Sequence, residues 1–204
     1  MSFTVLGLTG PSGAGKGVVA QRLRVVHGFA WIDTDAVYHE LISAPPPCLD
    51  ELVAAFGKEI LTPDGALDRP ALAALVFDPD HKDKLELLNA ITHKHVLAEA
   101  DRQIEAARAA GAKGAVIDAP LLFESGADRI CTHTLAVLAH RDIRLQRIMA
   151  RDGLTYQAAQ KRLDAQKPDA FYIERAEYIL ENNCDIAVMD AMLAFVDHLA
   201  KELL

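Results

Sequence analysis

Residues 10–17 (GPSGAGKG) constrain the fold of this chain more than any other feature. They follow the apolar run 3–8 and precede a helical pattern that begins at Lys16. A short apolar run bounded by turn residues is typical of a buried strand in a parallel sheet. Glycines let the backbone turn tightly, so that N–H groups at the positive end of the helix point at one phosphate. The order of strand, glycine-rich loop, lysine and helix therefore predicts a phosphate-binding loop.

The last residue of this loop departs from the usual pattern, which ends in a serine or threonine whose hydroxyl helps to hold Mg²⁺. Glycine at position 17 has no such ligand. Either water and a nearby carboxylate take over this position, or metal binding and turnover are weakened. The residues predicted to contact the nucleotide here are Gly10, Ser12, Gly13, Ala14, Gly15, Lys16 and Gly17, with Lys16 reaching the β- and γ-phosphates.

Acidic residues follow two further predicted strands. Asp33 and Asp35 come after residues 29–32, and Asp118 ends the run 114–118. Because ligands of open α/β sheets bind outside the carboxyl ends of the strands, these acids are expected near the phosphate loop. Asp33 is a candidate general base or Mg²⁺ contact, and Asp118 is placed like the acid that holds Mg²⁺ in phosphate-loop enzymes. Each of them is also a good helix cap, which is the alternative interpretation.

The alternation of strands with helices predicts an α/β fold with a five-stranded, parallel, doubly wound sheet. Its last two strands are predicted at 134–138 and 184–188, and a closing helix at 192–203. The region 36–110 has no strand pattern and predicts a helical insertion, with helices at 49–56, from Arg69-Pro70 onward, and at 80–110 as one long helix or two. Residues 1–35, 111–140 and 169–204 would form the core, and 141–168 a short helical lid.

Arginines recur after the fourth strand at 141, 144, 147 and 151, which places them near one side of a helix. Such rows are usually solvated. In a phosphate-loop protein they are also well placed to bind a transferring phosphoryl group, because the planar guanidinium suits phosphate oxygens. We favour Arg147 and Arg151 for this role. Thr155 is the predicted N-cap of the next helix, which runs to Gln166.

Composition excludes several classes of function. A net charge of −8 argues against a nucleic-acid-binding surface. No apolar stretch approaches the roughly 20 residues that span a bilayer. Cys48, Cys131 and Cys184 are widely separated and form no C-x-x-C pair, which favours a reducing compartment and buried thiols. These patterns predict a cytoplasmic protein that binds neither nucleic acid nor membrane, and they leave open a monomer or a small homo-oligomer.

The whole chain resembles the dephospho-coenzyme A kinase family. The resemblance rests on the phosphate loop, on IDTD at 32–35, on DAPLLFE at 118–124, on Arg147 with Arg151-Asp152, on Arg162 with Gln166, and on Asn182-Asn183. It implies transfer of the γ-phosphoryl group of ATP, with Mg²⁺, to the 3′-hydroxyl of dephospho-CoA. It also implies a helical domain at 36–110 that receives this substrate, and a mobile lid.

The family pattern implies the following site residues. Asp33, Lys16 and Arg147 would be catalytic, Arg147, Arg151 and Asn182 would join the loop in binding ATP, and Asp118 with Asp33 would hold the metal. Asp33, Asp35, His39, His93, Leu122, Glu124 and Gln166 would bind dephospho-CoA. For His93 a packing or capping role is equally compatible with the sequence.

Four positions depart from the family pattern. Gly17 replaces the hydroxyl residue, His39 and Tyr172 stand where the family usually has a basic residue, and Lys94 stands where a proline usually follows His93. Two alternatives therefore remain open at this point. One is a phosphate-loop kinase of another small molecule, and the other is a nucleotide-binding protein with impaired catalysis.

Overall fold

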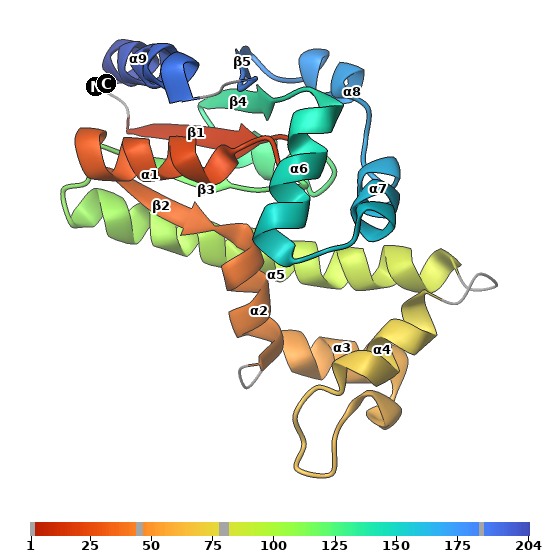
Figure 1. The fold of residues 1–204 in the computed structure, drawn as a ribbon. Helices are drawn as coiled ribbons and strands as arrows, with labels where there is room; N and C mark the ends of the chain where they lie inside the picture. Colours follow the sequence, from red (N-terminus) through yellow and green to blue (C-terminus); the bar gives the residue numbers. More distant parts are fainter. Residues whose placement is uncertain (1–2, 44–46, 78–81, 184–185) are drawn as a thin grey trace. The chain divides into compact units, whose positions relative to one another are not determined.

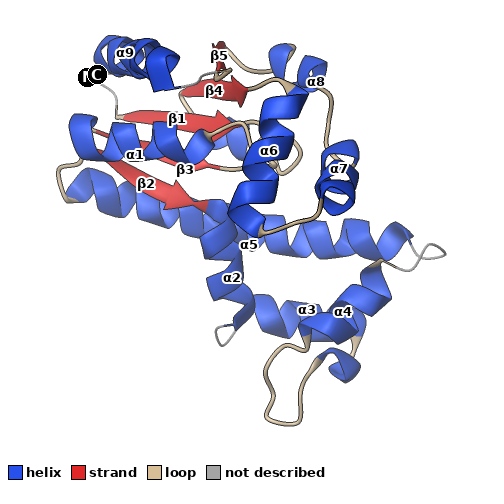
Figure 2. Cartoon of the chain, viewed as in Figure 1, coloured by secondary structure: helices blue, strands red, loops and turns tan. Residues whose placement is uncertain are grey.

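The computed structural model describes residues 3–43, 47–77, 82–183 and 186–204 (Figure 1). The chain divides into two compact units, one formed by residues 1–32 with 104–204 and the other by residues 33–103. Strands β1 to β5 form the sheet of the first unit, and the segment 34–103 contains helices and an isolated bridge between Leu61 and Leu67 (Figure 2).

The sheet has five parallel strands in the order β2-β3-β1-β4-β5. The strands are β1 (Thr4–Thr9), β2 (Phe29–Asp33), β3 (Gly114–Asp118), β4 (His133–Leu138) and β5 (Tyr178–Glu181). All six residues of β1 are buried, as a central strand covered on both faces requires. In the register Leu8 lies beside Asp118 on one side and beside Leu135 on the other. The phosphate loop therefore leaves the middle of the sheet, and Asp118 ends the neighbouring strand.

The described helices of this unit are α1 (Lys16–His27), α6 (Arg141–Asp152), α7 (Tyr156–Asp164), α8 (Asp169–Ile173) and α9 (Ile186–Leu203), with a 3₁₀ turn at Ala127–Ile130. Helices α1 and α9 pack together on the sheet, with Leu23 and Val196 fully buried between them. Gly28 ends α1 in the left-handed conformation, as the His27-Gly28 pair predicts. Helix α1 is thus anchored along its length, and its first residues hold the phosphate loop.

The unit 33–103 has a hydrophobic core of its own, which includes Ile42, Leu52, Ile60 and Leu72. It contains α2 (Thr34–Ser43), α3 (Cys48–Phe56), a 3₁₀ turn at Lys58–Ile60, α4 (Arg69–Val76) and most of α5 (Lys82–Ala109). The Asp68 side chain caps α4 by accepting a hydrogen bond from the amide of Ala71, and Pro70 occupies its first turn. Sequence patterns predicted both α3 and α4.

One predicted strand is wrong. The fifth strand is Tyr178–Glu181, whereas Ile186 already begins α9, and residues 184–185 lie outside the described part of the chain. Both segments are short apolar runs, which periodicity alone cannot assign to strand or helix. Strand pairing identifies residues 178–181 as the fifth strand, because Ile179 lies beside Ala136 of β4.

The helix predicted at 80–110 is one continuous helix from Lys82, with residues 80–81 outside the described part. Near its middle, the Thr92 hydroxyl donates to the Leu88 carbonyl one turn earlier, and the helix continues without a break. Thr155 caps α7 as predicted, by accepting from the amide of Ala158, although α7 ends at Asp164. Burial, and then nearby Asp128, raises the pKa of the Cys131 thiol to about 12, in agreement with a packing role.

Candidate active site

Two glycines of the loop are required by close packing. Gly10 has a φ of 136°, and a Cβ there would lie 2.1 Å from the carbonyl oxygen of Val137. Gly15 has a φ of 102°, and a Cβ there would lie 2.2 Å from Nδ2 of Asn182. Side chains at these positions would be strained and would collide with neighbouring atoms. The loop thus takes its shape from β4 and from the segment after β5.

Gly17 is different. It is exposed, its φ is not among the positive values of the chain, and a Cβ placed on it has no atom within 4 Å. It is the second residue of α1, where a side chain fits without strain. Packing therefore does not require the glycine that replaces the usual hydroxyl residue.

Lys16 and Arg147 lie directly on the loop. The Lys16 ammonium donates to the carbonyl oxygen of Gly10 at 2.8 Å. Nη1 of Arg147 donates to the carbonyl oxygens of Gly13 and Ala14 at 3.2 and 3.4 Å. Both predicted cations are therefore held beside the backbone that would bind the phosphates.

Asn182 connects Arg147 to the loop. The side chain is buried, its Nδ2 donates to the Ala14 carbonyl at 2.7 Å, and its Oδ1 accepts from Nη2 of Arg147 at 3.3 Å. The backbone amide of Asn182 also donates to the carbonyl of Leu138, which ties the residue to β4. Asn182 thus fixes both the loop and the arginine, as its predicted place in the nucleotide site requires.

Arg151 reaches the same loop from its exposed side. Its Nη2 donates to the Ser12 hydroxyl at 3.3 Å, and its Nε donates to Asp152 at 2.7 Å. Arg162 of α7 donates to the same carboxylate at 2.6 Å. Hydrogen bonds from Arg151, together with the charges of both arginines, hold the pKa of Asp152 below its usual value. This network connects α6, α7 and the loop.

Sequence reasoning passed over Arg144, which is the most buried arginine of the row. It is 6% exposed and donates to the carbonyl oxygen of Ser12 at 3.2 Å. The same guanidinium donates to Gln166, whose Oε1 also accepts the backbone amide of Ser12 at 2.8 Å. The spacing placed Arg144 on the correct side of the helix, but a charged residue is usually exposed, so its burial had no signal in the sequence.

Gln166 was expected among the residues that bind dephospho-CoA, and the structure places it on the phosphate loop. Asp118 ends β3 beside Leu8, and the next amide, of Ala119, donates to the Leu8 carbonyl at 2.9 Å. Among the described residues no cluster of three or more His, Cys, Asp or Glu side chains forms a metal cage. The single carboxylate of Asp118 fits Mg²⁺ bound together with nucleotide phosphates, since this ion keeps several waters and needs only one or two carboxylates.

Asp33 lies in the other unit, where it caps α2. Its Oδ1 accepts the backbone amides of Asp35 and Ala36 at 2.9 and 3.1 Å, and the side chain is exposed. Both hydrogen bonds go to the same oxygen. The cap therefore orients the carboxylate without using Oδ2, and the capping role expected as an alternative is compatible with a base.

An apolar hollow of about 250 Å³ lies within the unit 33–103. Its walls include Tyr38, Leu72 and Phe77, and two basic side chains, His39 and Arg69, lie among them. Phe77 is 69% exposed, which is unusual for phenylalanine. Predicted substrate residue His39 thus lines a hollow that combines apolar walls with nitrogen donors.

Other expected substrate residues differ in accessibility. Leu122 is fully buried beneath β1 at Gly7, so it has no surface for a ligand, whereas its neighbour Leu121 is 50% exposed. The physical reason is that Leu122 fills the space left by the glycine. Glu124 is exposed, as a ligand contact requires.

His93 is partly buried in α5, and Lys94 beside it forms an ion pair with Glu51 of α3 at 2.7 Å. Lys94 therefore joins two helices of the unit 33–103.

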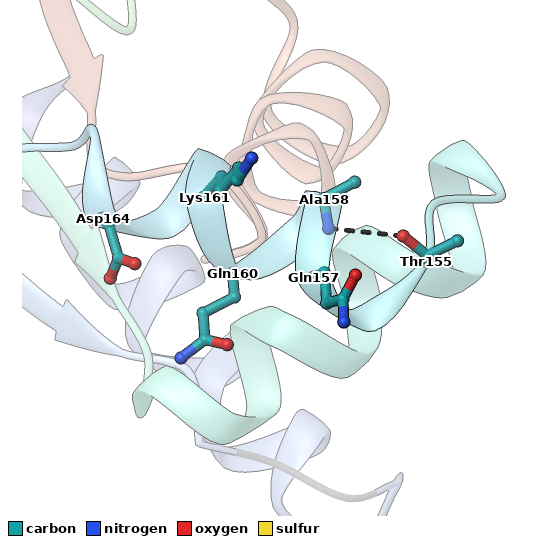
Figure 3. A pocket seen from close by; sticks show the side chains of 6 residues that line it. All are labelled: Thr155, Gln157, Ala158, Gln160, Lys161 and Asp164. Atoms are coloured by element: carbon teal, nitrogen blue, oxygen red, sulfur yellow. Dashed lines mark hydrogen bonds between the residues drawn. The ribbon is translucent and has the colours of Figure 1, made fainter.

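A second hollow, of about 440 Å³, lies along α7 (Figure 3). It is lined by exposed residues of α7 and by the N-cap of this helix: Thr155, Gln157, Ala158, Gln160, Lys161 and Asp164.

Comparison with known proteins identifies the family. The family model for dephospho-CoA kinase matches residues 4–187. A dephospho-CoA kinase of Corynebacterium efficiens is 39% identical over 199 residues, which cover 98% of this chain and 96% of that protein. One of Moorella thermoacetica is 40% identical over 183 residues, covering 89% and 85%.

The chain belongs to the dephospho-CoA kinase family. The family's activity is ATP-dependent phosphorylation of dephospho-CoA to coenzyme A. The match bears out the resemblance, the kinase class and the α/β fold, and no observation favours a different acceptor.

Solved structures agree on the fold. TT1252 of Thermus thermophilus superposes with a TM-score of 0.78 at 30% identity, and each chain is fully covered. A dephospho-CoA kinase of Campylobacter jejuni has a TM-score of 0.69 at 24% identity, with 98% of each chain covered. A shikimate kinase of Acinetobacter baumannii shares the fold with a TM-score of 0.51 at 15% identity, with 100% of this chain and 96% of that chain covered. Among the described residues, no helix is both long and apolar enough to cross a membrane.

Proposed function

We propose that this chain transfers the γ-phosphoryl group of ATP to the 3′-hydroxyl of dephospho-CoA, with the residues assigned below. The observation that carries the proposal is that Lys16 and Arg147 are both hydrogen-bonded to the phosphate loop in a chain of this family. Phosphoryl transfer needs positioning and charge stabilisation more than covalent chemistry, and these cations supply both.

The nucleotide lies on the loop from Gly10 to Gly17, whose amides bind its phosphates. On binding, Lys16 exchanges its bond to the Gly10 carbonyl for phosphate oxygens, because a charged acceptor makes the stronger hydrogen bond. Arg147 and Arg151 bind the phosphoryl oxygens from α6. Asn182 fixes the direction of Arg147 and so pre-organises the site for the charge that develops during transfer.

Asp33 is the proposed general base. Its Oδ1 is held by two amides of α2, so Oδ2 has a defined direction. Oδ2 accepts the proton of the 3′-hydroxyl as the bond from that oxygen to the γ-phosphorus forms and the bond from the γ-phosphorus to ADP breaks, so that ADP leaves. A positioned base of this kind contributes about 10²–10⁴-fold to the rate.

Asp118, with Asp33, is proposed to hold Mg²⁺ largely through water, because Gly17 has no hydroxyl. When bound, Mg²⁺ neutralises charge on the β- and γ-phosphates.

The unit 33–103 is proposed to receive the acceptor. Its apolar hollow suits the pantetheine arm, and His39 and Arg69 suit the phosphates. Asp35, His93, Glu124 and Gln166 remain proposed contacts of dephospho-CoA. The nucleotide-binding core (1–35, 111–140 and 169–204), the substrate domain (36–110) and the lid (141–168) keep these proposed roles. A cytoplasmic location, proposed from the cysteine pattern, and a monomer or small homo-oligomer complete the proposal.

The test is ADP release by the purified protein with ATP and Mg²⁺. Dephospho-CoA is compared with AMP, adenosine and no acceptor, and the product is identified by mass. Of these acceptors, we expect only dephospho-CoA to support ADP release. We expect Lys16→Ala to abolish this release. Turnover by Lys16→Ala at the rate of the parent protein would refute the proposed mechanism.

Asp33→Asn isolates the base, because asparagine caps a helix as well as aspartate does. We expect the variant to fold normally and to lose at least about 100-fold in kcat. Asp68→Asn is the matched control, since Asp68 caps α4 of the same unit in the same way. Equal activity of the two variants would exclude Asp33 as the base.

A further inference from the structure

The guanidinium of Arg144 occupies an unusual place for a charged side chain. It is 6% exposed in a unit whose other arginines of α6 are partly or fully accessible. All three of its nitrogens donate: Nε to the Ser12 carbonyl at 3.2 Å, Nη2 to Gln166 at 3.0 Å, and Nη1 to Asp169 at 3.3 Å. A buried charge is stabilised only by such a complete set of partners.

These partners belong to three separate segments. Ser12 is part of the phosphate loop, Gln166 lies between α7 and α8, and Asp169 begins α8. Gln166 accepts from Arg144 and from the Ser12 amide with the same oxygen. Because Arg144 also donates to the Ser12 carbonyl, this pair binds both backbone polar groups of Ser12. The backbone of α6 also contacts the loop directly, since a Cβ on Gly13 would lie 2.7 Å from the Arg144 carbonyl oxygen.

Tyr172 lies near the same guanidinium. Its side chain is 4% exposed in a small core cluster with Ala136 and Leu138. Burial raises the pKa of the Tyr172 hydroxyl, as does Glu124, while the charge of Arg144 acts in the opposite direction. Position 172 is thus filled by a core aromatic residue, and the positive charge beside it comes from α6.

We propose that Arg144 is a positioning residue for the phosphate loop. Arg144 fixes the peptide of Ser12 directly and through Gln166, and so sets the first half of the loop in its nucleotide-binding conformation. The inference rests on the proposed function only in naming ATP as the ligand of the loop.

The first test compares Arg144→Gln with Arg141→Gln in the purified full-length chain. Arg141 is on the same helix and pairs with Asp164 of α7, so its variant also removes a link between α6 and α7 but none to the loop. We expect Arg144→Gln to raise the Kd for ATP, measured by calorimetry, by about tenfold or more, and Arg141→Gln to leave it within twofold. Arg144→Lys keeps the positive charge but loses the planar set of N–H donors of the guanidinium. Its affinity for ATP should therefore lie between those of Arg144→Gln and the parent chain.

A merely structural role predicts a different pattern. If Arg144 acted only on stability, the KM values for ATP and dephospho-CoA would change together with the melting temperature. We expect the KM for ATP to rise about tenfold while the KM for dephospho-CoA stays within twofold. An unchanged Kd for ATP in Arg144→Gln, or an equal rise in both KM values, would overturn the positioning role.

The Kd for ATP is measured without an acceptor, so this result is independent of whether dephospho-CoA is the substrate.

Discussion

Gly17 offers the sharpest test of how this chain would hold the proposed Mg²⁺. Because a Cβ at position 17 meets no atom within 4 Å and the residue is in the first turn of α1, both Ala and Ser fit there. In a helix interior, replacing glycine by alanine raises the free energy of unfolding by about 1 kcal/mol. For Gly17→Ala, in the first turn, we expect an increase of about 0.5–1 kcal/mol. For a chain of this length this corresponds to about 1–4 °C in melting temperature. Gly17→Ser should gain roughly half as much in free energy of unfolding.

The two variants differ by one hydroxyl group, so they separate the backbone effect from the metal effect. We expect Gly17→Ser to reach half-maximal turnover at about tenfold lower Mg²⁺ than Gly17→Ala, since residues around a metal site commonly change its affinity by 10–100-fold. Tenfold corresponds to about 1.4 kcal/mol. The measurements are thermal unfolding, and ATP turnover across a titration of free Mg²⁺ at saturating acceptor.

Two results would refute this reasoning. A fall in melting temperature in both variants would mean that position 17 does not accept a side chain. Identical Mg²⁺ dependence of Gly17→Ser and Gly17→Ala would mean that the hydroxyl at this position is not a metal ligand in this chain. In that case Asp118, Asp33 and water would account for metal binding without a hydroxyl at position 17.

Two further substitutions test the scaffold of the site. Gly10→Ala should destabilise the chain by at least about 2 kcal/mol in urea unfolding, because of its φ of 136° and the collision with β4; stability equal to that of Gly17→Ala would contradict the packing argument. Hydrogen bonds from Arg22 and His27 hold the pKa of Asp197 well below its usual range. The Asp197 carboxylate therefore stabilises the fold fully above about pH 4, and this contribution is lost as the pH falls through the folded-state pKa. Asp197→Asn should therefore lower the free energy of unfolding by about 1–2 kcal/mol at pH 7. Below pH 4 the free energies of unfolding of the variant and the parent chain should differ less. A difference that stays constant at all pH values would exclude this ion pair as the cause.

Local patterns were sufficient wherever neighbouring residues decide the structure. The phosphate loop, the caps at Thr155 and Gly28, and the start of α4 at Arg69-Pro70 all follow from the conformational preferences of a few adjacent residues. The fifth strand could not be assigned in this way. Residues 178–181 and 184–188 are both short and apolar, and only pairing with β4 distinguishes them.

The same distinction between local pattern and tertiary structure holds for the candidate site. The sequence by itself predicts which residues carry the chemistry, because glycines, lysine, arginines and aspartates in this order suit phosphate and Mg²⁺. Only the tertiary structure decided that Arg144 is buried and bound to the loop, that Leu122 is covered while Leu121 is exposed, and that Gly17 has open space around it. Burial and open space depend on segments far apart in the chain, so the local sequence pattern does not contain them.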